Sequence, residues 1–336
     1  MLEQWLAEIA PDIQVHHGYI VRTPDGTLYL GRGEHEVFAH KLGKLTVNPQ
    51  SFVDFDTNII GRIAYTSRRN IKYVHAIAPD KESVVTEPLR ALNLTSFIDL
   101  YQKNCKAPFL DLRPQAPIAG AYYRTDTHWA LPLQMDAALR IVRAFGVNEG
   151  EIAERRALLT ENTTPLTRGF CGDLGIRFEP QETELRSDLR TRWMKSHSIT
   201  PLGGWNDGLI HIFRNAAGPK RRLLVFGDSF GHSLCNFLSV FFSDILFCRS
   251  GYFHKEMVDM MRPTHVLTQQ VERFLNASLR DAEARRFLLI PFINGSEIGA
   301  GPEFWSVLND VLTPPIVLPW YQRSRLVNSL MKYLPH

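Results

Sequence analysis

The spacing of apolar residues along this chain changes between a helical period and a strand-like period. Large apolar side chains three or four residues apart predict an amphipathic helix over residues 50–68. Similar patterns predict helices at residues 94–104, 134–145, 229–240 and 255–261. Apolar runs closed by turn residues predict buried strands at 71–78, 107–114, 221–227, 244–249 and 264–272. Alternation around the turn TPDG predicts a β-hairpin over residues 14–31.

Strands that alternate with helices predict an α/β fold, in which helices cover both faces of a doubly wound, mainly parallel sheet. In such sheets, ligands bind beyond the carboxyl ends of the strands. The residues that follow the predicted strands are unusually polar: Asp80, Lys81, Asp126, His128, Asp228, Ser229, Arg249, Glu272 and Arg273. We therefore expect a functional site at this edge.

Residues 148–205 interrupt this alternation, because they are rich in charge, Thr and Gly and have little periodicity. They are interpreted as an irregular insertion over the site, within one catalytic domain of residues 1–285. Residues 286–336 are expected to form a helical extension docked on the core. A role of this extension at a membrane surface or a partner remains an alternative.

Composition excludes several classes of protein. A net charge of +3 is too small to indicate a nucleic-acid-binding protein. The four cysteines form no CxxC pair, so neither a zinc site nor a disulfide framework is expected. No window reaches the roughly 18 apolar residues of a spanning helix, and the N-terminus does not resemble a secretory signal. We expect a cytoplasmic protein for the sequence as written, and a periplasmic one if it is a trimmed part of a longer chain.

The stretch LLVFGDSFGHSL places Ser229 between a predicted strand and a predicted helix. At such a helix N-terminus, the backbone N–H groups of Ser229 and Phe230 are expected to be free and to favour an anion. An oxyanion formed in acyl transfer would be stabilised there. The competing interpretation is that Ser229 or Asp228 only caps the helix.

The stretch YYRTDTHW contains a candidate base. Residues two apart in an extended segment point to the same side, so Asp126 could orient the imidazole of His128. A histidine packed in an ordinary loop is the alternative. A metal site is disfavoured, because no second pair of ligands stands nearby in the sequence.

Taken together, GDSF after an apolar strand and an upstream YYRTDTHW resemble the SGNH-hydrolase-like proteins of the alginate O-acetyltransferase family. IKYVHAIAPDK (71–81), GDLG (172–175) and HVLTQQVERFL (265–275) match in the same order, so that the resemblance covers roughly residues 17–280. It implies an SGNH-like fold with Ser229 as nucleophile, His128 as base and Asp126 as the residue that orients the base.

The chain also departs from simple SGNH enzymes. It lacks a clear Gly-x-Asn-Asp segment, which supplies an oxyanion donor in those enzymes. Arg249 is a candidate replacement, and a surface or ion-paired arginine is the alternative. Tyr123, Arg124 and Trp129 are candidates for a sugar-binding wall, against ordinary packing. Structural roles are favoured for Asp228, as a helix cap, and for Glu272 and Arg273, which are expected to pair with each other and hold the strand ends.

The resemblance implies an O-acetyltransferase that moves an acetyl group to a hydroxyl of a bacterial surface polysaccharide or its precursor. The donor would be acetyl-CoA or a relayed acetyl group, used as co-substrate with no bound cofactor or metal. Its partners would be the oligosaccharide or polysaccharide acceptor and other polysaccharide-assembly proteins. The alternatives are a carbohydrate O-acetylesterase of the SGNH type and a non-catalytic glycan-binding subunit of an assembly complex.

Overall fold

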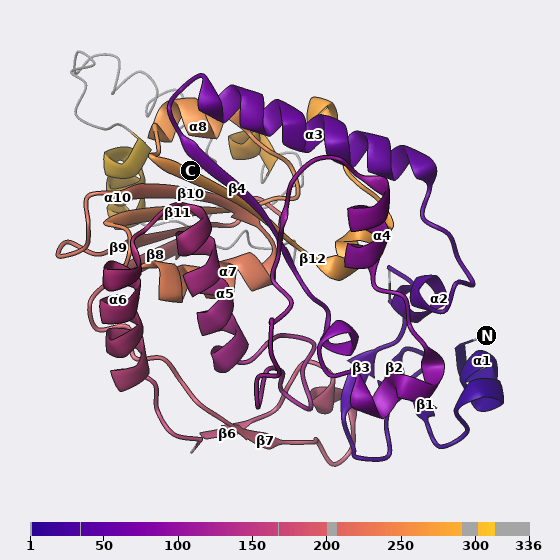
Figure 1. Ribbon diagram of the computed structural model, residues 1–336. Helices are drawn as coiled ribbons and strands as arrows, with labels where there is room; N and C mark the ends of the chain where they lie inside the picture. Colours follow the sequence, from indigo (N-terminus) through magenta and orange to yellow (C-terminus); the bar gives the residue numbers. More distant parts are fainter. Residues whose placement is uncertain (1, 34, 167, 200–206, 291–301, 313–336) are drawn as a thin grey trace.

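A mostly parallel sheet forms the centre of the computed structural model, which describes residues 2–33, 35–166, 168–199, 207–290 and 302–312 (Figure 1). Its seven strands, in spatial order, are β5 (Leu110–Asp111), β4 (Lys72–Ala78), β12 (His265–Val271), β10 (Arg222–Gly227), β11 (Asp244–Arg249), β9 (Ile210–Arg214) and β8 (Lys195–Ile199). The first five are parallel. β9 runs antiparallel to β11, and β8 runs antiparallel to β9.

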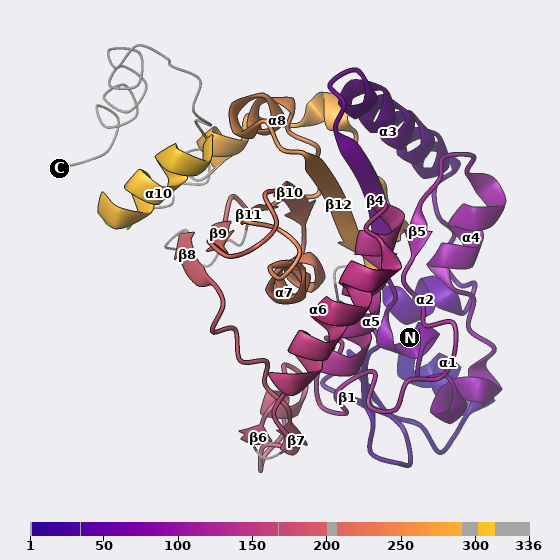
Figure 2. The same ribbon diagram turned by 60° about the vertical axis from the view of Figure 1, so that its left-hand side comes forward.

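Helices cover both faces of this sheet (Figures 1 and 2). One face carries α5 (Leu131–Ala144), α6 (Glu149–Glu161) and α7 (Ser229–Leu238), and the other carries α3 (Pro49–Ser67), α8 (Lys255–Met261) and α10 (Pro302–Leu312). Strand β10 shows why both faces are apolar. Leu223 and Val225 pack with α5 and α7, whereas Leu224 and Phe226 pack with α8 and α10. The predicted mixed α/β architecture with a mainly parallel sheet is therefore confirmed.

The N-terminal part of the chain forms a separate small lobe beside this sheet (Figure 1). It contains α1 (Leu2–Ile9), a three-stranded antiparallel sheet of β1 (Gln14–His16), β2 (Ile20–Arg22) and β3 (Leu28–Leu30), and α2 (Val37–Lys41). The TPDG turn joins β2 to β3, and the Asp25 carboxylate accepts hydrogen bonds from the Thr23 hydroxyl and the Thr27 N–H. The predicted hairpin is confirmed, with β1 as an additional strand.

The insertion is more regular than the sequence indicated. Asn148 caps α6 by accepting from the Glu151 N–H, and α6 buries Ile152 and Leu159 against the core. Downstream, β6 (Arg168–Phe170) pairs with β7 (Glu184–Arg186), and β8 joins the central sheet. The expectation of irregular structure was wrong at these places. The helical period of α6 is weak because the helix buries only two apolar residues, and β6 and β7 are too short to show an alternating pattern.

The remaining predicted elements are mostly present. The helices α3, α4 (Phe97–Asn104), α5, α7 and α8 correspond to the five helical patterns, whereas strand β5 is only two residues long. In the C-terminal extension, α10 buries Phe304, Leu308 and Val311. The segment 313–336, for which we expected a docked helical end, lies outside the described residues. Among the helices that the structure describes, none has the length and apolar character needed to cross a membrane.

Candidate active site

Ser229 stands at the junction of β10 and α7, and its neighbour Asp228 caps the helix. One Asp228 carboxylate oxygen accepts from the N–H groups of Phe230 at 2.8 Å and Gly231 at 3.4 Å. The other accepts from the Val271 N–H of the adjacent strand at 2.6 Å. The structural role favoured for Asp228 is confirmed. Because Asp228 supplies the cap, the Ser229 hydroxyl is left for other contacts.

The Ser229 hydroxyl contacts His128, which lies 101 positions earlier in the chain. His128 Nε2 is 2.8 Å from Ser229 Oγ, and His128 Nδ1 is 2.7 Å from Asp126 Oδ1. The same Asp126 oxygen accepts the His128 backbone N–H at 2.7 Å. The spacing of two residues thus places carboxylate and imidazole side by side. Serine, histidine and aspartate form one continuous hydrogen-bonded chain.

The electrostatics of Asp126 suit a group that holds an imidazole. Its side chain is 9% exposed, whereas that of His128 is 36% exposed. Burial alone would raise the pKa of Asp126, but hydrogen bonds and charge from His128, and the Asp173 N–H, lower it below 3.8. Asp126 is therefore a carboxylate at neutral pH. It fixes the His128 tautomer with the proton on Nδ1, which leaves Nε2 able to accept the Ser229 proton.

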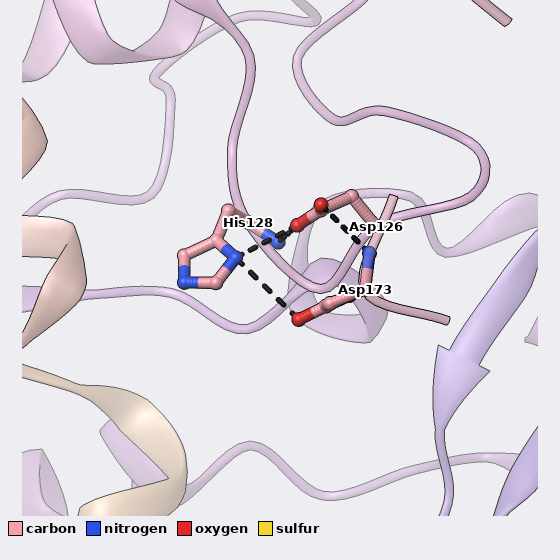
Figure 3. Close-up of side chains that lie close together, drawn as sticks. All are labelled: Asp126, His128 and Asp173. Carbon is pink, nitrogen blue, oxygen red and sulfur yellow. Dashed lines mark hydrogen bonds and ion pairs between the residues drawn. The ribbon is translucent and has the colours of Figure 1, made fainter. Parts of the chain in front are cut away.

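Asp173, which the sequence interpretation did not count as a site residue, lies on the same side of the imidazole (Figure 3). Its carboxylate is 3.6 Å from His128 Nδ1 and accepts from the Thr127 N–H at 2.7 Å and the Thr127 hydroxyl at 2.5 Å. In return, the Asp173 N–H donates to Asp126 Oδ2 at 3.0 Å. Asp173 therefore positions both Asp126 and the loop that carries His128. Its presence in the GDLG motif was the one signal that could have indicated this.

The insertion holds this loop closely. A Cβ atom at Gly172 would lie 2.6 Å from Asp126 Cβ and would overlap the Thr125 carbonyl oxygen, so only glycine fits there. The Glu184 carboxylate accepts from both the N–H and the hydroxyl of Thr125 at 2.6 Å, and from the Arg124 N–H at 2.9 Å. Residues 172–184 thus build the candidate site rather than only covering it.

Phe230 and Trp129 both pack in the interior, although Trp129 also lines the pocket that contains Asp126 and His128. The Phe230 N–H is bound to Asp228, so the expectation that it is free as an oxyanion donor was wrong. Its fully buried ring instead lies 5.1 Å from the His128 ring, between centroids, and the same distance from Trp129. Trp129 is also fully buried, and its indole N–H donates to Ser233 Oγ at 2.9 Å. Phe230 thus packs against the imidazole, and Trp129 packs against Phe230.

The other two candidates for a sugar-binding wall, Tyr123 and Arg124, lie in different surroundings. Tyr123 lines a pocket of about 390 Å³ together with Asp126 and His128. Its ring packs 4.9 Å from that of Phe170, over which the Arg186 guanidinium lies at 4.9 Å. Arg124 does not line this pocket. Its guanidinium binds the Gly26 carbonyl at 2.9 Å and Glu182 at 3.1 Å, which indicates a structural role.

Arg249 ends β11 next to Gly227 of β10, and lines a different pocket that also contains Gly227 and Asp228. Among the described residues its guanidinium has no hydrogen bond or ion pair. Arg249 is therefore not an ion-paired arginine among the described residues.

Glu272 and Arg273 do not pair with each other as expected, since Glu272 binds Lys41 at 3.1 Å and Arg273 binds Asp80 at 2.5 Å.

Asp126, His128 and Asp173 are also the only group of described residues whose ligand atoms are close enough together to hold a metal ion. Their oxygen and nitrogen atoms already have partners, however. The carboxylates accept from His128, Thr127 and the Asp173 N–H, and His128 Nε2 faces Ser229. The donor set fits a hydrogen-bonded acid–base site better than a metal centre.

Comparison with known proteins supports the fold. No protein-family model matches the chain, and no curated protein matches it by sequence. The solved structure of Bacillus cereus PatB1 with a sulfonyl adduct is similar, with a TM-score of 0.55 and 13% identity, over 78% of this chain and 97% of that one. A DHHW family protein from Eubacterium siraeum has a TM-score of 0.51 and 14% identity, over 80% and 95%.

The O-acetyltransferase domain of Pseudomonas putida AlgJ is a further match, with a TM-score of 0.47 and 16% identity, over 82% of this chain and 99% of that domain. PatB1 and the DHHW family protein have the higher TM-scores, and it is on these two that the fold likeness rests. At identities this low, the chain shares a fold with them, and its chemistry has to be argued from its own residues.

Proposed function

We propose that this protein is an O-acyltransferase that moves an acetyl group to a carbohydrate hydroxyl through a seryl acyl-enzyme. The observation that carries the proposal is the chain of hydrogen bonds from Ser229 through His128 to Asp126. A serine hydroxyl becomes an effective nucleophile only when a base takes its proton and a third group orients that base. A serine, a histidine and an aspartate, which suit these three roles, lie here within hydrogen-bond distance of one another.

In the first step, Ser229 Oγ attacks the carbonyl carbon of the acetyl donor while His128 Nε2 takes the hydroxyl proton. The tetrahedral intermediate collapses when the bond to the leaving group breaks, and His128 gives its proton to that group. The products are acetyl-Ser229 and the free alcohol or thiol of the donor. The donor is an acetyl ester or thioester such as acetyl-CoA, used as a co-substrate.

In the second step, a sugar hydroxyl attacks the acetyl-enzyme. His128 Nε2 accepts the hydroxyl proton and returns it to Ser229 Oγ as the acyl bond breaks. Asp126 stays ionised and stabilises the imidazolium in both steps, as its lowered pKa requires. The enzyme ends unchanged, and one acetyl group has moved from donor to sugar.

The oxyanion of each intermediate needs a donor near Ser229. The Ser229 N–H has no acceptor among the described residues and lies at the positive end of the α7 dipole. Arg249, whose guanidinium has no hydrogen bond or ion pair with any described residue, is the second donor that we propose. The Ser229 N–H thus keeps the role expected for it, and Arg249 takes the place of the Phe230 N–H, which is bound to Asp228.

The acceptor reaches His128 from the pocket of about 390 Å³ that contains Tyr123, Phe170 and Arg186. A base can deprotonate only a hydroxyl within hydrogen-bond reach, so the acceptor has to bind on the His128 side. Aromatic rings beside charged groups match the apolar faces and the hydroxyls of a sugar ring. We propose an oligosaccharide or polysaccharide acceptor, and polysaccharide-assembly proteins as partners.

Hydrolysis is the second candidate function, because the His128 side chain is 36% exposed and is therefore accessible to water. The test mixes the protein, an acetyl donor and a panel of oligosaccharides, and follows both acetylated sugar and free acetate. Transfer predicts that the yield of acetylated sugar rises with sugar concentration. Release of acetate alone over the whole panel would assign the protein as an esterase. Glycan binding without donor cleavage would assign a non-catalytic subunit.

A further inference from the structure

A second pocket reaches the Ser229 turn and is separate from the one that contains His128. It has a volume of about 550 Å³ and is lined by Gly227 and Asp228, the two residues directly before Ser229, and by Arg249 and Gln269. It shares no lining residue with the Tyr123 pocket. Two distinct pockets therefore approach the candidate nucleophile, one beside His128 and one beside Gly227 and Asp228.

Gln269 is the unusual residue of this second pocket. It lies on β12 with 3% of its surface exposed, and neither polar atom of its side-chain amide has a hydrogen-bond partner among the described residues. A buried amide without partners is destabilising, and such groups in native proteins are commonly explained by a bound water, an ion or a catalytic role. The Gln269 N–H₂ group lacks a hydrogen-bond acceptor among the described residues, and a ligand bound in the pocket could supply one.

The Gln269 amide also lies against the turn that carries the nucleophile. A Cβ atom at Gly227 would lie 2.9 Å from Gln269 Oε1, and one at Gly231 would overlap the same atom. Gly227 and Gly231 stand two residues before and two residues after Ser229. The two glycines therefore leave room for the Gln269 amide directly beneath the Ser229 turn.

The chemistry of acyl transfer assigns different roles to the two pockets. His128 has to reach both the leaving group and the incoming hydroxyl, so both bind on its side of Ser229. The carbonyl oxygen and the rest of the acyl group point to the other side. A carbonyl oxygen is a hydrogen-bond acceptor, and among the described residues neither the Gln269 amide nor the Arg249 guanidinium has an acceptor.

We propose that the Gln269 pocket is the acyl subsite, and that the Gln269 amide binds the acyl group of the donor and determines which acyl groups are accepted. This inference rests on the proposed function and specifies where the donor's acyl group lies. The Gln269 amide N–H₂ group donates a hydrogen bond to the carbonyl oxygen of the acyl group. In this way it binds the ester before attack and remains bound to the acyl-enzyme.

The experiment compares wild type with Gln269→Met, which keeps the shape of the side chain and removes its polar atoms. Turnover of acetyl, butyryl and hexanoyl p-nitrophenyl esters measures acyl selectivity. The KM for an oligosaccharide acceptor and the Tm are measured on the same samples. Tyr123→Ala is the matched control for the other pocket. Gln134→Met is the control for a buried glutamine with a partner, since the Gln134 amide donates to the Trp129 carbonyl at 2.7 Å.

We expect Gln269→Met to lower kcat/KM for the acetyl ester at least tenfold and to move the preference toward longer, apolar acyl groups. The acceptor KM should stay unchanged, and the Tm should be equal to or above that of wild type, whereas Gln134→Met should lower it. Tyr123→Ala should raise the acceptor KM and leave the acyl preference as it was.

The inference is overturned if Gln269→Met retains wild-type kcat/KM, or if it loses activity together with a fall in Tm and no change in acyl preference. The first result would mean that the Gln269 amide forms hydrogen bonds only with water. The second would mean that it only stabilises the fold. An inactive wild-type protein would overturn the proposed function itself. These outcomes can be told apart, because only the last one concerns the wild type.

Discussion

His128 Nε2 lies 2.8 Å from the hydroxyl of Ser229, although the two residues are 101 positions apart in the sequence. The contact forms because the loop after β5 and the turn after β10 meet at the same edge of the sheet, where the carboxyl ends of parallel strands gather. Behind the imidazole, Asp126 and Asp173 both lie on the Nδ1 side (Figure 3).

Replacement of Ser229 by alanine should abolish ester turnover and leave the fold almost unchanged. Asp228, not Ser229, caps α7, so Ser229→Ala should cost less than about 0.5 kcal/mol in the free energy of unfolding. Urea denaturation and ester hydrolysis on one sample measure both quantities. Asp228→Ala is the matched control and should cost about 1–3 kcal/mol, because it removes the cap and the bond to Val271. Retained turnover in Ser229→Ala would rule out the serine as nucleophile.

Asp126→Asn should lower kcat/KM by about 10²–10⁴-fold, because the amide no longer stabilises the imidazolium or enforces its tautomer. It should also change the dependence of stability on pH. The pKa of Asp126 is lowered in the folded state, so its carboxylate stabilises the fold above pH about 4, and this stabilisation is lost as pH falls through the lowered value. The difference in unfolding free energy between wild type and Asp126→Asn should therefore shrink between pH 6 and pH 3. A difference that grows in acid would contradict this.

Gly172→Ala should move the loop that carries Asp126. The added Cβ would overlap the Thr125 carbonyl oxygen and approach Asp126 Cβ to 2.6 Å, so we expect a loss of about 1–3 kcal/mol in stability and a marked loss of turnover. Gly169→Ala is the control from the same insertion, since a Cβ there meets nothing within 4 Å. Thermal unfolding and ester turnover compare the pair. Equal behaviour of the two variants would show that the insertion does not position the site.

Removal of metal ions should leave turnover unchanged. The atoms of Asp126, His128 and Asp173 that could bind a cation already accept or share protons with their neighbours. Activity is measured before and after treatment with EDTA, and again with added Zn²⁺ or Mn²⁺. Loss of activity with EDTA and its recovery with one metal would replace the acid–base site by a metal site.

The sequence was sufficient to predict those features that depend on short-range patterns. The apolar run 223–226 with Gly227 after it indicated a buried strand, and the two-residue spacing of Asp126 and His128 indicated their contact. The contact of His128 with Ser229 needed more, namely the strand order of a parallel sheet and a family resemblance.

The features that the sequence did not show depend on long-range contacts. The Phe230 N–H is bound because Asp228 caps α7, and a capping side chain accepts from the N–H groups two and three residues further on; the cap expected for Asp228 and the free Phe230 N–H expected beside it were therefore incompatible. Helix α6 has only two buried apolar positions, Ile152 and Leu159, so its amphipathic signal is weak. Asp173 reaches His128 only because the insertion folds back onto residues 125–128.

The most direct test of the account is detection of the acyl-enzyme. Wild type, Ser229→Ala and His128→Gln are incubated with an activated acetyl ester, quenched in acid and mapped by peptide mass spectrometry. A parallel reaction uses a sulfonyl fluoride, which transfers its sulfonyl group to activated nucleophiles. Wild type should carry one acetyl or one sulfonyl group on Ser229, Ser229→Ala should carry none, and His128→Gln should acquire the group at least about 100-fold more slowly. A modification on another residue, or equal labelling of Ser229 with and without His128, would contradict it.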